Sequence, residues 1–256
     1  MKRITVKVGS NVLTRADGNL DFTRMSSLVD QIVELRRRGI DVVLVSSGAV
    51  ASGRGEMRLK STDLDEVSAR QLFSAVGQAK LMNRYFELFR NDGIFCGQVL
   101  TTKENFADTE HYRNQKRCME VMLANGVVPI VNENDTVSIT ELMFTDNDEL
   151  SGLIAEMVES EILVLLSNVD GIYDGDPADP DSRVIREIRP KDNIDSFISS
   201  KKSSLGRGGM ASKCSVARRV AASGNPVVLA NGKREDVLLK IFDDPAGTLC
   251  TRFLTK

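Results

Sequence analysis

The sequence has little of the chemistry on which protein metal sites and acid–base catalysis usually depend. Its 256 residues include one histidine, His111, and four cysteines. Cys96, Cys118, Cys214 and Cys250 are far apart and form no CxxC pair, which excludes a standard zinc cluster. We expect them to be reduced thiols that serve as small core residues. His111 stands alone in DTEHYRNQ, which favours a surface or helix-start position over a catalytic base.

Long apolar runs and a strong excess of one charge are also missing. No run approaches the length of a membrane span, and the N-terminus alternates like a strand without a signal-peptide core. Thirty-four basic and thirty-six acidic residues give a formal net charge of −2, which argues against a nucleic-acid or membrane partner. We therefore expect a cytoplasmic protein that binds neither nucleic acid nor a membrane.

The chain does have a regular alternation of short apolar runs with amphipathic segments of helix length. The expected strands cover residues 4–8, 41–48, 94–100, 127–135, 161–171, 226–232 and 247–253. The expected helices cover 24–39, 65–92 (as one helix or two), 110–125, 147–160 and 210–224. Apolar, β-branched strands between helices predict an α/β fold, a mainly parallel central sheet in a three-layer αβα sandwich. No stretch resembles a domain linker, so residues 1–256 are expected to form one domain.

Polar residues follow four of these strands at their carboxyl ends. The segments are KVGSN (7–11), SSGA (46–49), NENDT (132–136) and SNVDG (167–171). In an open α/β sheet, ligands bind beyond this edge. Each segment alone is more typical of helix caps and turns, but the four together predict one site at the rim of the sheet.

Lys7 interrupts the first apolar strand, ITVKVG. A buried lysine is costly unless an anion pairs with it. Gly9 follows at once, which suits a backbone that approaches a ligand closely. The alternative is an edge-strand lysine that points to solvent. We expect Lys7 to bind an anion.

The segment LGRGGMASK (205–213) has three glycines within four positions and then a lysine. It is not a Walker A loop, because no Gly-Lys-Ser/Thr follows, and no strand leads into it as in a dinucleotide-binding turn. What remains is a glycine turn that opens a helix and carries Lys213 in the first helical turn. Free N–H groups and the helix dipole suit an anion at this place, and Lys213 can reach the same anion. The alternative is a flexible connection before a helix.

Carboxylate and amide side chains supply the counterpart to these cations. Asp146 and Asp148 stand on either side of Asn147 at a helix start, where the simplest interpretation is a helix cap. As part of a site, a carboxylate between two lysines would fix both without touching the substrate. Three side chains of the NENDT segment suit the amino or carboxylate group of a small polar ligand: Asn132, Asn134 and Asp135.

Eight segments spread over nearly the whole chain form a specific combination. In order they are VKVGSNVLT, VVLVSSGAVASGR, RQLFSAVGQAKLM, VPIVNENDTV, DNDELS, LLSNVDGIY, GRGGMASK and GTLC. In these segments the chain resembles the amino-acid kinase family, and within it the branch that acts on L-glutamate. The resemblance implies ATP-dependent phosphorylation of the γ-carboxylate of L-glutamate to glutamyl 5-phosphate, the first step of proline synthesis. It also implies Mg²⁺ bound mainly through the nucleotide phosphates.

The resemblance also implies roles for individual residues. The expected catalytic group is Lys7, Lys213 and Asp148, with Asp148 orienting both lysines. The expected ATP site comprises Lys7, Gly9, Ser167, Asn168, Arg207, Gly208, Gly209, Met210, Ala211, Ser212 and Lys213. The expected substrate site comprises Ser47, Gly48, Asn132, Asn134, Asp135 and Asn147. The N-terminal part would then bind glutamate and the C-terminal part ATP, and no protein ligand to a metal is expected.

The chain departs from the family pattern in two places. Many relatives carry Thr-Asp where this chain has Ser167-Asn168, and many continue into a C-terminal PUA domain, which we expect this chain to lack. The resemblance further implies feedback inhibition by proline, a homodimer or homotetramer, and a functional link to the reductase that consumes glutamyl phosphate. Two alternatives stay open: a kinase of this fold for another carboxylate or for carbamate, and a proline or nucleotide sensor without activity.

Overall fold

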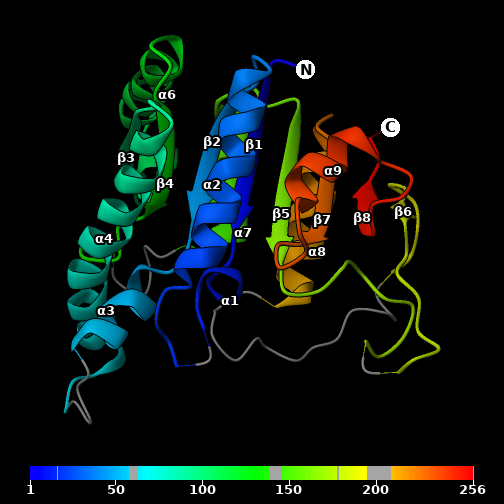
Figure 1. Ribbon diagram of the computed structural model, residues 1–256, viewed down its shortest axis with the longest axis horizontal. Coiled ribbons are helices and arrows are strands. Elements are labelled where there is room, and N and C mark those ends of the chain that lie inside the picture. Colours follow the sequence, from blue (N-terminus) through cyan, green and yellow to red (C-terminus); the bar gives the residue numbers. More distant parts are fainter. Residues whose placement is uncertain are drawn as a thin grey trace.

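One twisted sheet runs through the middle of the protein, with helices on both of its faces (Figure 1). The structure is a computed structural model that describes residues 1–15, 17–57, 63–138, 144, 146–177, 179–194 and 209–255. Within these residues the sheet has eight strands in the order β3-β4-β2-β1-β5-β7-β8-β6. The predicted three-layer α/β fold is therefore confirmed.

The sheet is mainly parallel, as the apolar strands predicted. Its strands are β1 (Arg3–Val8), β2 (Asp41–Ser46), β3 (Cys96–Thr101), β4 (Val128–Glu133), β5 (Ile162–Ser167), β6 (Glu187–Ile188), β7 (Val227–Asn231) and β8 (Cys250–Phe253). Among the described residues, only the β7–β8 pair is antiparallel. The neighbours β4, β2, β1 and β5 are parallel, so their carboxyl ends lie side by side at one edge.

The helices include four that the apolar periodicity did not indicate. In chain order they are α1 (Ser10–Leu13), α2 (Phe22–Arg37), α3 (Ala49–Met57), α4 (Glu66–Asn91), α5 (Glu104–Ala107), α6 (Thr109–Ala124), α7 (Asn147–Met157), α8 (Met210–Ala222) and α9 (Val237–Asp243). The segment predicted as one helix or two is the single helix α4. The sequence prediction missed α1, α3, α5 and α9, together with the two-residue strand β6.

Alternation along β1 assigns its side chains to the two faces of the sheet. Ile4, Val6 and Val8 belong to one buried core, which also includes residues of α2, α4 and α9. The cores on the opposite face contain residues of α6, α7 and α8. Lys7 alternates with Ile4, Val6 and Val8, so its side chain lies on the opposite face of the sheet and points toward α7 and α8. It lies on a central strand, which excludes the solvent-facing edge position.

Helices α3 and α4 cross at unusually close range. A Cβ atom added to Gly53 of α3 would lie 1.8 Å from the carbonyl oxygen of Phe73, and one added to Gly77 of α4 would lie 1.8 Å from that of Ala49. Only glycine permits such an approach of two backbones. Because α3 starts two residues after Ser47, this crossing holds α4 close to the polar rim of the sheet.

Several smaller expectations can be compared with the structure. His111 is exposed near the start of α6, and its N–H donates to Asp108 at 2.8 Å, as predicted. Cys118 is exposed while the other three cysteines are buried, so the prediction of four core thiols is wrong at that position. The strand expected over 161–171 ends at Ser167, and a turn follows. Within the described part of the chain, no helix is long and apolar enough to span a membrane.

Candidate active site

Two lysines from distant parts of the sequence share one carboxylate. Lys7 Nζ of β1 lies 2.6 Å from Asp148 Oδ1, and Lys213 Nζ of α8 lies 2.9 Å from Asp148 Oδ2. The Asp148 side chain is 0% exposed, against 6% for Lys7 and 11% for Lys213. Such burial of three charges is costly unless they are paired. One carboxylate between two cations leaves this group with a net positive charge.

The start of α7 explains why Asp148 is available to the lysines. Asp146 caps the helix, and its Oδ1 accepts the N–H groups of Asp148 at 2.9 Å and Glu149 at 3.0 Å. The capping interpretation therefore applies to Asp146. Asp148 lies inside the helix and its carboxylate turns to Lys7 and Lys213.

Burial and charge act in opposite directions on Asp148. Desolvation raises the pKa of its carboxyl group, but the charges of Lys7 and Lys213 and their hydrogen bonds outweigh it, so that the pKa falls below its ordinary value of 3.8. Asp148 is therefore ionised at neutral pH. A carboxyl group with a lowered pKa in the folded state stabilises the fold above its unfolded-state pKa, and this contribution is lost as the pH falls through the folded-state pKa.

Replacement of Asp148 by asparagine should destabilise the protein at pH 7 by about 3–5 kcal/mol, because it leaves two buried lysines without a counter-charge. The difference from the wild type should shrink as the pH falls below about 3.8, because the Asp148 carboxyl group of the unfolded wild type is protonated there, and it should vanish once the pH has fallen below the lower pKa of the folded state. Urea unfolding at pH 7, 5, 4 and 3 measures this. A stability difference that stays constant over the whole series would contradict the ionised triad.

The rim beside the lysines has features that suit a polyphosphate. The α8 helix has Gly209 as its N-cap, without a capping side chain, so its first N–H groups and dipole face outward next to Lys213. A Cβ added to Gly9 would stand 3.5 Å from Lys7 Nζ, so glycine leaves space beside this amine. Met210, Ala211 and Ser212 form the first turn of α8. Arg207 and Gly208, expected to contact ATP, lie outside the described residues.

Strand β5 brings Ser167 and Asn168 to the same rim. β5 pairs with β1 in register, with Leu166 opposite Val8, and the N–H of Gly9 donates to the Leu166 carbonyl at 3.3 Å. Ser167 is buried, whereas Asn168 is exposed and accepts a 3.5 Å hydrogen bond from the Ser167 hydroxyl. Both predicted nucleotide residues therefore lie beside the strand that carries Lys7.

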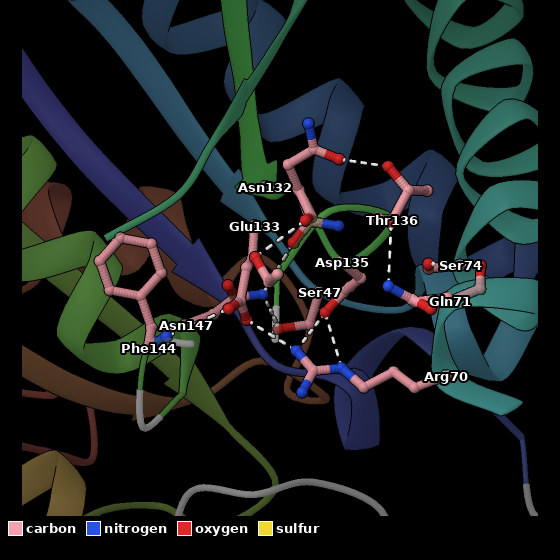
Figure 2. Close-up of polar contacts among 12 residues, drawn as sticks. Ser47, Arg70, Gln71, Ser74, Asn132, Glu133, Asp135, Thr136, Phe144 and Asn147 are labelled. Atoms are coloured by element: carbon pink, nitrogen blue, oxygen red, sulfur yellow. Dashed lines mark hydrogen bonds and ion pairs between the residues drawn. The ribbon is translucent and has the colours of Figure 1, made fainter. Parts of the chain in front are cut away.

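A second cluster consists of uncharged polar groups, among them Ser47, Asn132 and Asn147 (Figure 2). Asn147 Nδ2 donates to Ser47 Oγ at 2.8 Å and to Asn132 Oδ1 at 3.0 Å, and Asn132 Nδ2 donates to Gln78 Oε1 at 3.0 Å. These contacts join the carboxyl ends of β2 and β4 to the start of α7. Among the described residues, Asn147 Oδ1 is buried without a hydrogen-bond partner, so this oxygen is available to accept a hydrogen bond from a ligand.

Asp135 is held by an arginine that sequence reasoning did not single out. Arg70 of α4 donates through Nε to Asp135 Oδ1 at 2.7 Å and through Nη2 to Glu133 Oε2 at 2.9 Å. Figure 2 shows its side chain reaching from α4 to both carboxylates. Glu133 Oε1 also accepts the N–H of Phe144 at 3.1 Å. Glu133 could have been noticed as a charged residue that directly follows the apolar run 127–131 and Asn132, but Arg70 has the pattern of an ordinary helix surface.

Asn134 and Gly48 lie at the same edge of the sheet. Asn134 Oδ1 accepts a hydrogen bond from Thr136 Oγ1 at 2.6 Å, and its side chain is half-buried. Gly48 has φ +111°, which favours glycine, and its carbonyl accepts the N–H of Ser52 at 2.8 Å. All six residues predicted to bind the substrate therefore belong to the carboxyl end of β4, to the turns after β2 and β4, or to the start of α7.

Consecutive residues of α7 connect the two clusters. Asn147 contacts Ser47 and Asn132, whereas Asp148 contacts Lys7 and Lys213. The first turn of α7 thus joins a positively charged region to a region rich in neutral hydrogen-bonding groups. No group of three or more His, Cys, Asp or Glu residues in the described part of the chain could hold a metal ion by itself, and both oxygens of Asp148 face lysines. The donor set suits phosphate groups and a small polar acceptor.

Comparison with known sequences identifies relatives over nearly the whole chain. The profile of the Amino acid kinase family matches residues 2–231. Glutamate 5-kinase of Bacteroides thetaiotaomicron is 62% identical over 252 residues, which cover 98% of this chain and 70% of that protein. Glutamate 5-kinase of Symbiobacterium thermophilum is 44% identical over 253 residues, covering 98% of this chain and 96% of that protein.

Solved structures with low sequence identity share the fold. Carbamate kinase from Giardia lamblia bound to AMP-PNP superimposes with a TM-score of 0.69 at 16% identity, covering 100% of this chain and 99% of that chain. An isopentenyl phosphate kinase substrate complex gives a TM-score of 0.69 at 19% identity, covering 99% and 100%. At this identity the likeness concerns the fold alone.

Proposed function

The chain belongs to the amino acid kinase family, and we propose that it transfers the γ-phosphoryl group of ATP to the γ-carboxylate of L-glutamate. The observation that carries the proposal is the pairing of Lys7 and Lys213 on the two oxygens of Asp148, one residue away from the cluster around Asn147. Relatives with 62% and 44% identity named glutamate 5-kinase support glutamate as the acceptor. The product is an acyl phosphate, glutamyl 5-phosphate, made for proline synthesis.

The reaction needs charge stabilisation more than proton transfer. A carboxylate acceptor is ionised at neutral pH, so no general base is required. Its oxygen forms the new bond to the γ-phosphorus while the bond from that phosphorus to the bridging oxygen of ADP breaks. The obstacle is repulsion between two anions, and catalysis consists mainly of positioning and electrostatic stabilisation. Lys7, Lys213 and the first N–H groups of α8 supply positive charge for the migrating phosphoryl group.

The Asn147 cluster supplies groups for the glutamate head group. Asp135 carries the charge that an α-ammonium group needs, and Asn147 Oδ1 offers a further acceptor. The Ser47 hydroxyl and the backbone at Gly48 can donate to a carboxylate. Mg²⁺, when bound to the nucleotide phosphates, would neutralise part of their charge, and the lack of a ready-made carboxylate cage in the described residues suits binding through the phosphates. The glutamate groups belong mainly to residues before 150 and the ATP groups, apart from Lys7 and Gly9, to residues after it.

Three finer features follow from the same proposal. Proline, an amino acid smaller than glutamate, would compete at the glutamate site and inhibit the enzyme. The active form would be a homodimer or homotetramer in the cytoplasm. Because an acyl phosphate hydrolyses readily, a reductase that consumes it would act next, with or without direct docking.

The test is γ-phosphoryl transfer trapped as a hydroxamate. With glutamate, ATP, Mg²⁺ and hydroxylamine, the enzyme should form glutamyl hydroxamate and release one ADP for each, because hydroxylamine displaces phosphate from the acyl phosphate. Omission of ATP is the control. Aspartate, glutarate and carbamate in place of glutamate should give little ADP.

The outcomes separate the three hypotheses. ADP release with carbamate or another carboxylate, but not with glutamate, would show a different substrate on the same fold. Binding of proline or nucleotide without any transfer would show a sensor. Hydroxamate formed with glutamate, but not with the other acceptors, supports the proposal.

A further inference from the structure

We propose that Arg70 is a positioning residue for the acceptor site, one that acts through Asp135 to set the affinity for the amino-acid substrate. The inference rests on the proposed function, because it assigns Asp135 to the ammonium group of glutamate. Arg70 itself comes from α4 and is not required to touch the substrate. Its role is to hold the carboxylate that does.

The contacts of Arg70 fix both carboxylates at the end of β4. Its Nε donates to Asp135 Oδ1 at 2.7 Å, and its Nη2 donates to Glu133 Oε2 at 2.9 Å and also contacts Asp135 Oδ1. The Arg70 side chain is 13% exposed, against 2% for Glu133 and 10% for Asp135. The planar guanidinium group, with several donors in fixed directions, is suited to such a double contact. Asp135 is thereby restrained while water has little access to it.

The charges of these three side chains point to a cationic group as the ligand. Glu133 and Asp135 are like charges that repel each other in a site with little solvent, and Arg70 contacts both of them. In the proposed function the α-ammonium group of the amino acid adds a positive charge beside these two carboxylates. Without Arg70, two neighbouring carboxylates would repel each other in a buried position, and Asp135 would lose the two hydrogen-bond contacts that Arg70 makes with its Oδ1.

Helix α4 is well suited to hold an orienting group, because other contacts fix it against β4. Gln71 Nε2 donates to the Thr136 carbonyl at 3.1 Å (Figure 2), and Gln78 accepts from Asn132 at 3.0 Å. On its other side, the Gly53–Gly77 crossing locks α4 onto α3. A small displacement of an orienting group can cost a large factor in substrate binding and turnover. Arg70 therefore sits on a rigid support directly behind the proposed ammonium subsite.

The test compares Arg70→Gln and Arg70→Lys with Arg84→Gln, an arginine of the same helix that lies over the Phe22 ring and pairs with the exposed Glu87 at 2.9 Å. Arg70→Gln should raise KM for glutamate at least about tenfold, the cost of losing hydrogen bonds to a charged group, with KM for ATP unchanged within about twofold. Arg70→Lys keeps the positive charge but lacks the planar guanidinium group that contacts both carboxylates. Its KM for glutamate should therefore lie between that of the wild type and that of Arg70→Gln. Arg84→Gln should behave as the wild type.

A double variant shows whether Arg70 acts through Asp135. Asp135→Asn alone should raise KM for glutamate, and adding Arg70→Gln should raise it no further than about twofold, because the carboxylate to be oriented is gone. Independent, multiplying effects would overturn the proposal. So would a normal KM for glutamate in Arg70→Gln or, if that variant does not fold, in Arg70→Lys. Absence of glutamate phosphorylation by the wild type would instead overturn the proposed function.

Discussion

Replacement of Lys213 by alanine is expected to lower kcat by about 10²–10³-fold, the usual cost of removing one preorganised charge-stabilising donor. Lys213 lies in the first turn of α8 and reaches the same carboxylate as Lys7. In the proposed reaction the two ammonium groups lie on either side of the migrating phosphoryl group, so the loss of one weakens the transition state more than it weakens binding of ATP. The fold should persist, because Asp148 keeps its 2.6 Å contact with Lys7.

The measurement is ADP release with both substrates saturating, alongside the thermal midpoint of unfolding. Lys116→Ala is a matched control, because Lys116 also forms a 2.6 Å ion pair, with Glu159, but far along α6 and at the surface. It should leave kcat unchanged. Turnover like that of the wild type in Lys213→Ala would remove Lys213 from the catalytic group, whereas an unfolded variant would show that the triad is needed for stability first.

Replacement of Gly77 by alanine is expected to destabilise the protein by about 3 kcal/mol, at the upper end of the range for overpacked interiors. The added methyl group would lie 1.8 Å from the carbonyl oxygen of Ala49 and 2.4 Å from the N atom of Gly53. Both neighbours are backbone atoms of α3, which cannot turn away as a side chain can. The two helices must therefore separate. Because α4 carries Arg70, this separation should also raise KM for glutamate.

Urea unfolding at pH 7 measures the first effect and steady-state kinetics the second. Ala79→Leu, on an exposed position of the same helix, adds more atoms on the solvent side and should change stability by no more than about 0.5 kcal/mol. Stability of Gly77→Ala within that same margin would show that the crossing can relax. Lower stability with an unchanged KM for glutamate would show that α4 moves without disturbing the acceptor site.

Local signals in the sequence singled out three residues that the structure brings together: Lys7, Asp148 and Lys213. Lys7 is conspicuous because it breaks an apolar strand, and its neighbours on both sides are fully buried. The glycines before Lys213 mark a helix start, and Asp148 lies near another. Each of these features depends on a few adjacent residues. The structure brings them together because parallel strands align their carboxyl ends, which is a general property of the fold.

The sequence could not show what holds the acceptor side together. Arg70 begins the segment RQLFSAVGQAKLM, which contributes to the family resemblance, but its position on an amphipathic helix does not distinguish it from an arginine that faces water. Its partners Asp135 and Glu133 are 65 and 63 residues away in the sequence. Only the packing of α4 against the rim brings them within reach. The hydrogen bond between Asn132 and Gln78 also joins residues that are far apart in the sequence, at a separation of 54 residues.

Helix α3 was missed for a related reason. Its sequence, AVASGRGEM, contains two glycines and little apolar periodicity, and glycine disfavours an isolated helix. In the folded protein the packing of α3 against α4 compensates for the low helix propensity of Gly53, because the absence of a side chain lets the backbone of α4 come close. Helix α9 has only seven residues and starts from Asp236, whose φ is +51°. Such short elements follow from tertiary contacts and leave no periodic pattern of their own.

The position of β1 has a consequence for how much of the chain can be removed. The first strand in sequence is central in space, hydrogen-bonded to β2 on one side and to β5 on the other. Deleting the first ten residues would therefore remove the strand that joins β2 to β5, and with it Lys7 of the candidate active site. The sheet would fall into two blocks, β3-β4-β2 and β5-β7-β8-β6, with no strand to join them. A synthetic peptide of residues 1–15 added to such a truncated chain should restore cooperative unfolding and activity together, because one segment provides both.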